Sequence, residues 1–163
     1  MKINTIRMVL LFFLLANFSI IFMFSSQDAK ESGNISSKMA RMVEQKTGKA
    51  IEKKEKSVGR TEKVIRKIAH FSIYTSLGFL LMAFVSTYAL TQRKRILVSL
   101  SIGVLYAISD EIHQIFVPGR ASQITDVMLD SMGILFGILV VLMILKIKQK
   151  IKNKNNKIVE KHG

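Results

Sequence analysis

The sequence contains no cysteine among its 163 residues and only one proline. The absence of cysteine excludes disulfide bridges, thiolate metal sites and cysteine nucleophiles. The chain also has no HExxH metal-binding motif, no serine nucleophile elbow and no glycine-rich phosphate-binding loop. Acidic residues are scarce, since 11 Asp and Glu stand against 25 Lys and Arg, and the formal net charge is +14. No short catalytic motif therefore assigns a reaction.

The apolar residues are gathered into four runs, which cover residues 8–24, 68–90, 96–117 and 127–145. A hydrocarbon core about 30 Å thick needs about 20 helical residues at about 1.5 Å each, and every run is close to that length. Because the runs make up about half of the chain, a soluble domain with a single core is excluded. The sequence predicts an all-α membrane protein, a four-transmembrane-helix bundle with an amphipathic helical loop between the first and second spans.

The polar segments divide the chain into a short N-terminus (residues 1–7), a transmembrane domain (8–145) and a basic tail (146–163). The loop over residues 25–67 is rich in Lys and Arg, and Gly48 and Gly59 argue against one continuous helix in it. The first apolar run is longer than the hydrophobic region of a cleavable signal peptide, and Ser25-Ser26-Gln27-Asp28 is a poor cleavage context. We therefore expect an uncleaved first span.

The Lys and Arg residues lie beside the apolar runs, where they set the orientation of a membrane protein and contact anionic lipid headgroups. We therefore expect membrane lipids as partners, and no nucleic acid. The five-residue segment 91–95 carries Arg93, Lys94 and Arg95, and such short segments next to spans dominate the positive-inside rule. This cluster predicts a multi-pass cell-membrane protein with both termini in the cytoplasm and the loop 25–67 outside.

The polar residues within the apolar runs have a shared location in the predicted topology. In four antiparallel spans, the start of the second, the end of the third and the start of the fourth lie at the same membrane face. These places hold almost every intramembrane polar residue, and helical spacing puts Lys67, His70 and Tyr74 on one helix face. The candidate site residues are Lys67, His70, Tyr74, Asp110, Glu111, His113, Gln114, Arg120, Asp126 and Asp130.

A charged side chain at the bilayer centre costs about 2.5–3.5 kcal/mol, so a chain that carries several must pair them or use them. A structural network with Lys67 and Arg120 and a functional polar cavity both remain open. In the second case, the candidates for acid–base catalysis are His70, Asp110, Glu111 and His113. The candidates for ligand binding are Lys67, Tyr74, Gln114, Arg120, Asp126 and Asp130. Of these, Lys67 and Arg120 would hold an anionic group of the ligand. Asp110 and His113 would supply any proton transfer. Two imidazoles and several carboxylates could hold a divalent metal, but their spacing is weak evidence, and we expect no metal and no cofactor.

The segment after the third span contains the single proline, Pro118, followed by Gly119 and Arg120. Proline ends the helix and glycine permits a tight reversal, so Arg120 is expected to turn back over the acidic residues. Its planar guanidinium could pair with their carboxylates, and removing such a partner costs about 3–5 kcal/mol. On the fourth span, Gly133 and Gly137 form a small-xxx-small pattern that favours close helix packing.

Three ordered segments resemble signatures of the VanZ family. Residues 66–74 (RKIAHFSIY), followed by Leu77-Gly78, are similar to the first signature. Residues 110–120 (DEIHQIFVPGR), followed by Asp126, Asp130 and Gly133, are similar to the second. The segment that begins with Phe24-Ser25-Ser26-Gln27 resembles the part of the family that follows the first span. The resemblance covers roughly residues 10–145 and leaves the basic tail outside.

The resemblance implies an integral membrane protein of the cell envelope. The family's namesake is associated with lowered susceptibility to teicoplanin-type glycopeptides, without the usual remodelling of the peptidoglycan terminus. By this resemblance, the expected ligand is a lipid-linked envelope precursor or a lipoglycopeptide, which the polar site would bind or modify. The alternative is a non-catalytic assembly or partner-binding protein whose polar residues only stabilise the bundle.

Overall fold

The computed structural model describes residues 3–26, 54–118 and 123–162, together with Lys38 and Met42. The long helices are α1 (Ile3–Ser25), α3 (Lys54–Val85), α4 (Gln92–Ile115) and α5 (Ile124–His162). Each contains a segment long and apolar enough to cross a membrane, and the described residues include no strand. The predicted all-α protein with four spans is therefore confirmed. The predicted helical loop falls largely on residues outside the described ones.

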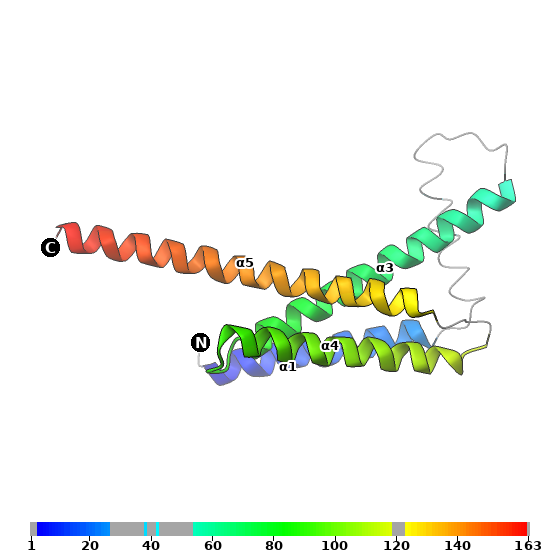
Figure 1. Ribbon diagram of the computed structural model, residues 1–163, viewed down its shortest axis with the longest axis horizontal. Coiled ribbons are helices and arrows are strands. Elements are labelled where there is room, and N and C mark those ends of the chain that lie inside the picture. The colour runs from blue at the N-terminus through cyan, green and yellow to red at the C-terminus, as the bar shows by residue number, and fades with distance from the viewer. Residues whose placement is uncertain (1–2, 27–37, 39–41, 43–53, 119–122, 163) are drawn as a thin grey trace.

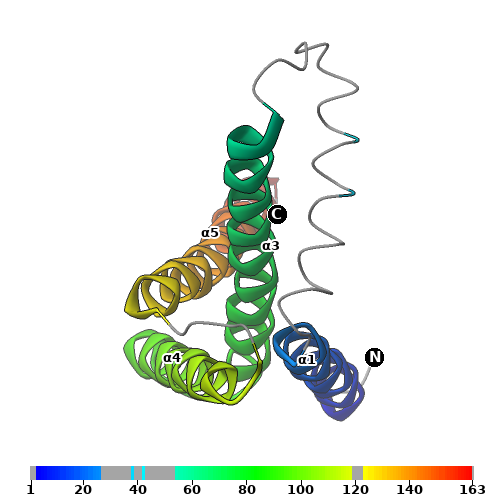
Figure 2. The same cartoon turned by 90° about the vertical axis from the view of Figure 1, so that its right-hand side faces the viewer.

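The four helices alternate in direction, and α3 crosses the other three obliquely (Figure 1). Viewed from the end, α1 lies on one side of α3, while α4 and α5 lie on the other (Figure 2). Helix α3 contacts α1, α4 and α5, and its interface with α5 is the most extensive in the molecule. This arrangement places the start of α3, the end of α4 and the start of α5 at one end of the bundle.

The interface between α3 and α5 depends on glycines that allow the two backbones to approach closely. A Cβ atom on Gly133 would lie 2.7 Å from the Phe71 carbonyl oxygen, and one on Gly78 or Gly137 would overlap backbone atoms of the facing helix. Only residues without a side chain fit at such positions. The predicted packing role of Gly133 and Gly137 is confirmed.

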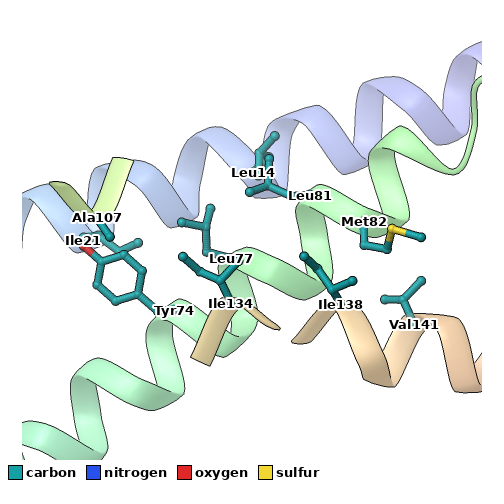
Figure 3. Packing of buried hydrophobic residues seen from close by; sticks show 10 residues of the cluster. All are labelled: Leu14, Ile21, Tyr74, Leu77, Leu81, Met82, Ala107, Ile134, Ile138 and Val141. Carbon is teal, nitrogen blue, oxygen red and sulfur yellow. The ribbon is translucent and has the colours of Figure 1, made fainter. Parts of the chain in front are cut away.

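An apolar core lies beside this crossing, with residues from all four helices (Figure 3). It is formed by Leu14, Ile21, Tyr74, Leu77, Leu81, Met82, Ala107, Ile134, Ile138 and Val141. The other apolar side chains of the spans are largely exposed, as expected for helices whose outer faces contact lipid. This core therefore joins all four helices in the interior of the bundle.

Helix α3 begins before the predicted second span (residues 68–90) and ends before the last residue of that span. Helix α3 begins at Lys54, within the predicted loop, and continues through Gly59. One glycine costs a helix only about 1 kcal/mol relative to alanine, which the flanking helix-forming residues offset. At the other end, α3 stops at Val85 rather than Leu90. The backbone N–H groups of Thr87 and Tyr88 there form turn hydrogen bonds of 3.0 and 3.1 Å to carbonyls three residues back.

The connection between α3 and α4 also differs from the predicted turn over residues 91–95. Thr91 caps α4, since its side chain accepts a hydrogen bond from the backbone N–H of Lys94, and the three basic residues belong to the first turn of that helix. Arg7 of α1 fastens the connection. Its guanidinium donates to the Thr87 carbonyl at 2.8 Å and lies 4.3 Å from the centre of the Tyr88 ring.

The predicted basic tail (residues 146–163) continues α5, which runs without a break to His162 (Figure 1). Its final turns project beyond the other helices and carry a lysine at every second position from Lys146 to Lys154. The part of these turns whose side chains are described is exposed on all sides. The tail therefore extends the fourth span as a charged helix.

Candidate functional site

A polar cluster lies at the end of the bundle where α3 and α5 begin and α4 ends. We use this name for Lys67, His70, Tyr74, Asp110, Gln114, Asp126 and Asp130. Helical spacing directs these side chains inward, because 67, 70 and 74 share one face of α3, 110 and 114 are one turn apart on α4, and 126 and 130 are one turn apart on α5. The structure thus brings together seven of the ten predicted site residues.

Asp130 lies in the interior of the cluster, and its side chain is 0% exposed. Nδ1 of His70 is 3.8 Å from Oδ1 of Asp130, a distance that allows an ion pair but no hydrogen bond. Neither carboxylate oxygen of Asp130 has a hydrogen-bond partner among the described residues. A buried carboxylate without hydrogen bonds is unusual in proteins. Removing such an ion from water costs several kcal/mol, and hydrogen bonds normally offset that cost.

Tyr74 is also fully buried, and it extends from α3 towards Ala107 of α4 (Figure 3). Its hydroxyl is within electrostatic range of the carboxyl groups of Asp110 and Asp130. No described residue forms a hydrogen bond of ordinary geometry with this hydroxyl. The His70 ring stacks beside the Tyr74 ring with 6.4 Å between the centroids. Helix α3 and helix α5 therefore each contribute a buried side chain, Tyr74 and Asp130, whose oxygen atoms form no hydrogen bond with the described residues.

Asp110 completes the interior of the cluster from α4. Its Oδ2 accepts a hydrogen bond of 3.1 Å from Nε2 of Gln114, one helical turn further along. Both side chains are buried. Because Gln114 fixes the carboxylate of Asp110 in the interior, this carboxylate is held in place near Tyr74 before any ligand arrives.

The cluster reaches the surface through Lys67 and Asp126. Nζ of Lys67 is 3.5 Å from Oδ1 of Asp126, and the two side chains are 51% and 32% exposed. His70, at 21%, lies between this pair and the buried Asp130. The cluster therefore includes a partly exposed pair, Lys67 and Asp126, and a deeper pair, His70 and Asp130.

Glu111 lies beside the cluster and has a different role. Its side chain is buried, and Oε2 accepts a hydrogen bond of 3.1 Å from the backbone N–H of Gln123. This contact joins the end of α4 to the segment that leads into α5. Glu111 therefore helps to fix the return of the chain at Gln123. The predicted partner of the acids, Arg120, lies outside the described residues.

His113 faces α1 rather than the acidic residues. Its ring stacks on Phe22 with centroids 4.9 Å apart, and its Nε2 lies 3.2 Å from Oγ of Ser26. The Ser26 hydroxyl donates its hydrogen to the Phe22 carbonyl at 2.8 Å, so Nε2 of His113 is the donor to Ser26. Among the described residues, His113 forms no ion pair with Asp110, the other residue at the end of α4 that is a candidate for proton transfer.

Sequence reasoning did not include α1 in the site, although two of its residues reach this end. Ser26 contacts His113, and Ser25 is fully buried with no hydrogen-bond partner for its hydroxyl among the described residues. The signal for them was the Phe24-Ser25-Ser26-Gln27 segment. Among the residues that the structure describes, no group of three His, Asp or Glu side chains is placed to hold a metal ion.

The comparison with protein families agrees with this architecture. The model of the family described as VanZ/LLP1 matches residues 10–146, which is most of the chain and includes at least part of each of the four spans. The chain belongs to this family. No curated protein and no solved structure matches this chain. The protein is therefore a VanZ-like protein with the composition and helices of a multi-pass membrane protein.

Proposed function

We propose that this protein binds the polar head of a lipid-linked envelope component or lipoglycopeptide at the polar cluster, and thereby lowers susceptibility to teicoplanin-type glycopeptides. The observation that carries the proposal is the pair of fully buried side chains, Asp130 and Tyr74, whose polar oxygens have no hydrogen-bond partner among the described residues. A bundle that needed the cluster for stability alone would be expected to satisfy these atoms, because unpaired buried polar groups are destabilising.

An amphiphilic ligand suits the surroundings of the cluster. The headgroup would reach the interior past the partly exposed Lys67 and Asp126, while the apolar outer faces of the spans would remain against its lipid chain. Family membership supports an envelope role, since the family name is that of a protein linked to teicoplanin. Gln114 and Glu111 fix the site from α4, and the ligand would supply the partners that Tyr74 and Asp130 lack.

The test of this proposal is Asp110→Asn in a Gram-positive host that lacks its own VanZ-like protein. Asparagine has the same shape and can still accept the Gln114 hydrogen bond through its carbonyl oxygen, so the variant should accumulate normally. It loses the negative charge, and we expect teicoplanin susceptibility to return to that of the host without the protein. The measurement is the minimal inhibitory concentration together with the amount of protein in membranes.

The matched control is Ser109→Ala, which changes the exposed neighbour of Asp110 on α4 and should leave susceptibility unaltered. Unchanged susceptibility of the Asp110→Asn strain at normal protein level would refute the binding proposal. Loss of the protein from the membrane would instead favour the alternative, a cluster that only stabilises the bundle.

The proposed orientation places the polar cluster in the outer leaflet and both termini in the cytoplasm. The chain has no cysteine, so single introduced cysteines report the orientation without background. We expect Gln123→Cys, near the cluster, to react with a membrane-impermeant thiol reagent in intact cells. Gln92→Cys, beside the basic first turn of α4, should react only after the cells are opened. The opposite pattern would place the cluster in the inner leaflet.

A further inference from the structure

Among the residues that the structure describes, acidic side chains outnumber basic ones in the polar cluster. Helices α4 and α5 contribute four carboxyl groups to this end of the bundle, from Asp110, Glu111, Asp126 and Asp130. Among the described residues, the basic side chains that face them are Lys67, which contacts Asp126, and His70, which faces Asp130. Within the described polar cluster, the three carboxyl groups of Asp110, Asp126 and Asp130 therefore accompany one permanently charged base, Lys67.

The excess of negative charge is concentrated in the interior. Lys67 is half exposed and lies at the surface end, whereas Asp130 is fully buried and Asp110 nearly so. Asp110 and Asp130 are close enough to interact electrostatically with each other as well as with Tyr74. Two carboxylates in an apolar interior repel each other, and a cation placed between them would remove that repulsion and much of their desolvation cost.

The Tyr74 hydroxyl provides an observation independent of the acidic residues. It is fully buried on α3, lies within electrostatic range of Asp110 and Asp130, and has no hydrogen-bond partner among the described residues. A phenol oxygen can accept a hydrogen bond, and carboxylates accept only. Asp110, Asp130 and Tyr74 therefore offer acceptors from three helices, and a primary ammonium group has three N–H donors to match them.

We infer that the headgroup bound at the polar cluster carries a primary amine, whose ammonium group is held between Asp110 and Asp130 with Tyr74 as the third acceptor. This inference rests on the proposed function and names the ligand chemistry of the same site. A phosphate or carboxylate would have to enter past Lys67 and then face the two buried acids, where like charges repel. A neutral hydroxyl group could satisfy single oxygens but would leave the paired negative charges uncompensated.

The test uses the purified full-length protein in phosphatidylcholine nanodiscs and three probes with the same ten-carbon chain: decylamine, decanol and decanoate. The shift in thermal-unfolding midpoint with probe concentration gives an apparent Kd for each probe. We expect decylamine to bind most tightly. Because hydrogen bonds to charged groups contribute about 1.5–3 kcal/mol, Asp130→Asn should weaken decylamine binding about 10- to 100-fold.

The matched control is Asp126→Asn, which removes the same charge one turn nearer the surface on the same helix. Lys67 already faces Asp126, so this variant should weaken decylamine binding by much less than Asp130→Asn. Tighter binding of decanoate or decanol than of decylamine would overturn the inference. Equal shifts with all three probes in both wild type and Asp130→Asn would also overturn it, because they would indicate a general effect on the bilayer. The absence of any shift with decylamine would overturn it as well.

These outcomes are separate from those of the proposed function. If decanoate binds best while the Asp110→Asn strain loses its protection against teicoplanin, the site is functional and its ligand is anionic. If decylamine binds at Asp130 while Asp110→Asn leaves susceptibility unchanged, the amine site exists but the resistance role fails.

Discussion

Gly137→Leu is expected to prevent stable assembly of the bundle. A Cβ atom at this position would overlap the Thr75 carbonyl oxygen and lie 2.6 Å from the Phe79 backbone nitrogen, and leucine adds three further carbons. Backbone atoms cannot move aside as a flexible side chain does, so α3 and α5 would have to separate along their main interface. We expect a loss of at least about 3 kcal/mol, the upper end of ordinary overpacking. Unfolding in mixed micelles with increasing denaturing detergent measures it.

Two alanine variants provide a matched comparison. The atoms nearest to a Cβ atom on Gly103 belong to the buried side chain of Ile134, at 2.8 Å and beyond, whereas those nearest to a Cβ atom on Gly137 are backbone atoms. Both substitutions gain about 1 kcal/mol of helix propensity. Because a side chain can shift more easily than a backbone, Gly103→Ala should be less destabilising than Gly137→Ala. Equal stability of the two variants would show that the close approach of α3 and α5 is not required.

Tyr74→Phe is expected to separate function from stability. It removes a fully buried hydroxyl that has no hydrogen-bond partner among the described residues and keeps the ring that packs in the core. Removing an unsatisfied polar group at constant shape is neutral or stabilising. The variant should therefore unfold at the same or a higher detergent concentration, while the host loses its protection against teicoplanin. Both unfolding and minimal inhibitory concentration are measured on the same variant.

Tyr74→Ala is the control for the packing contribution of the ring. It empties a core position shared with Leu77 and Ile134, and such truncations of aromatic side chains cost about 3–5 kcal/mol. If Tyr74→Phe were as destabilising as Tyr74→Ala, the hydroxyl would have to be a structural hydrogen-bonding group. The polar cluster would then serve the bundle rather than a ligand.

The amino-acid sequence by itself determined the class of protein and the end of the molecule where the polar residues gather. Four continuous apolar runs of about 20 residues predict membrane-spanning helices, which satisfy their backbone polar groups within each segment; the strands of a membrane barrel are about half that length. Alternating direction then follows from the connections, and it places His70, Asp110 and Asp130 at one end whatever the orientation. The packing role of Gly133 and Gly137 was also predictable, since a four-residue spacing of small residues has few other uses in a span.

Only the tertiary structure decided which of these polar residues share a site. Periodicity places Asp110, His113 and Gln114 on nearby faces of one helix, but the positions of the neighbouring helices determine what each side chain meets. Because α1 packs beside α4 at this end, His113 contacts Phe22 and Ser26, while Asp110 meets Tyr74 of α3. Glu111, which helical spacing set apart from the others, is buried because the chain returns over it at Gln123. Such contacts depend on the angles at which the helices cross. Those angles are set by the side chains of both helices at each interface, so the pattern of one helix does not reveal them.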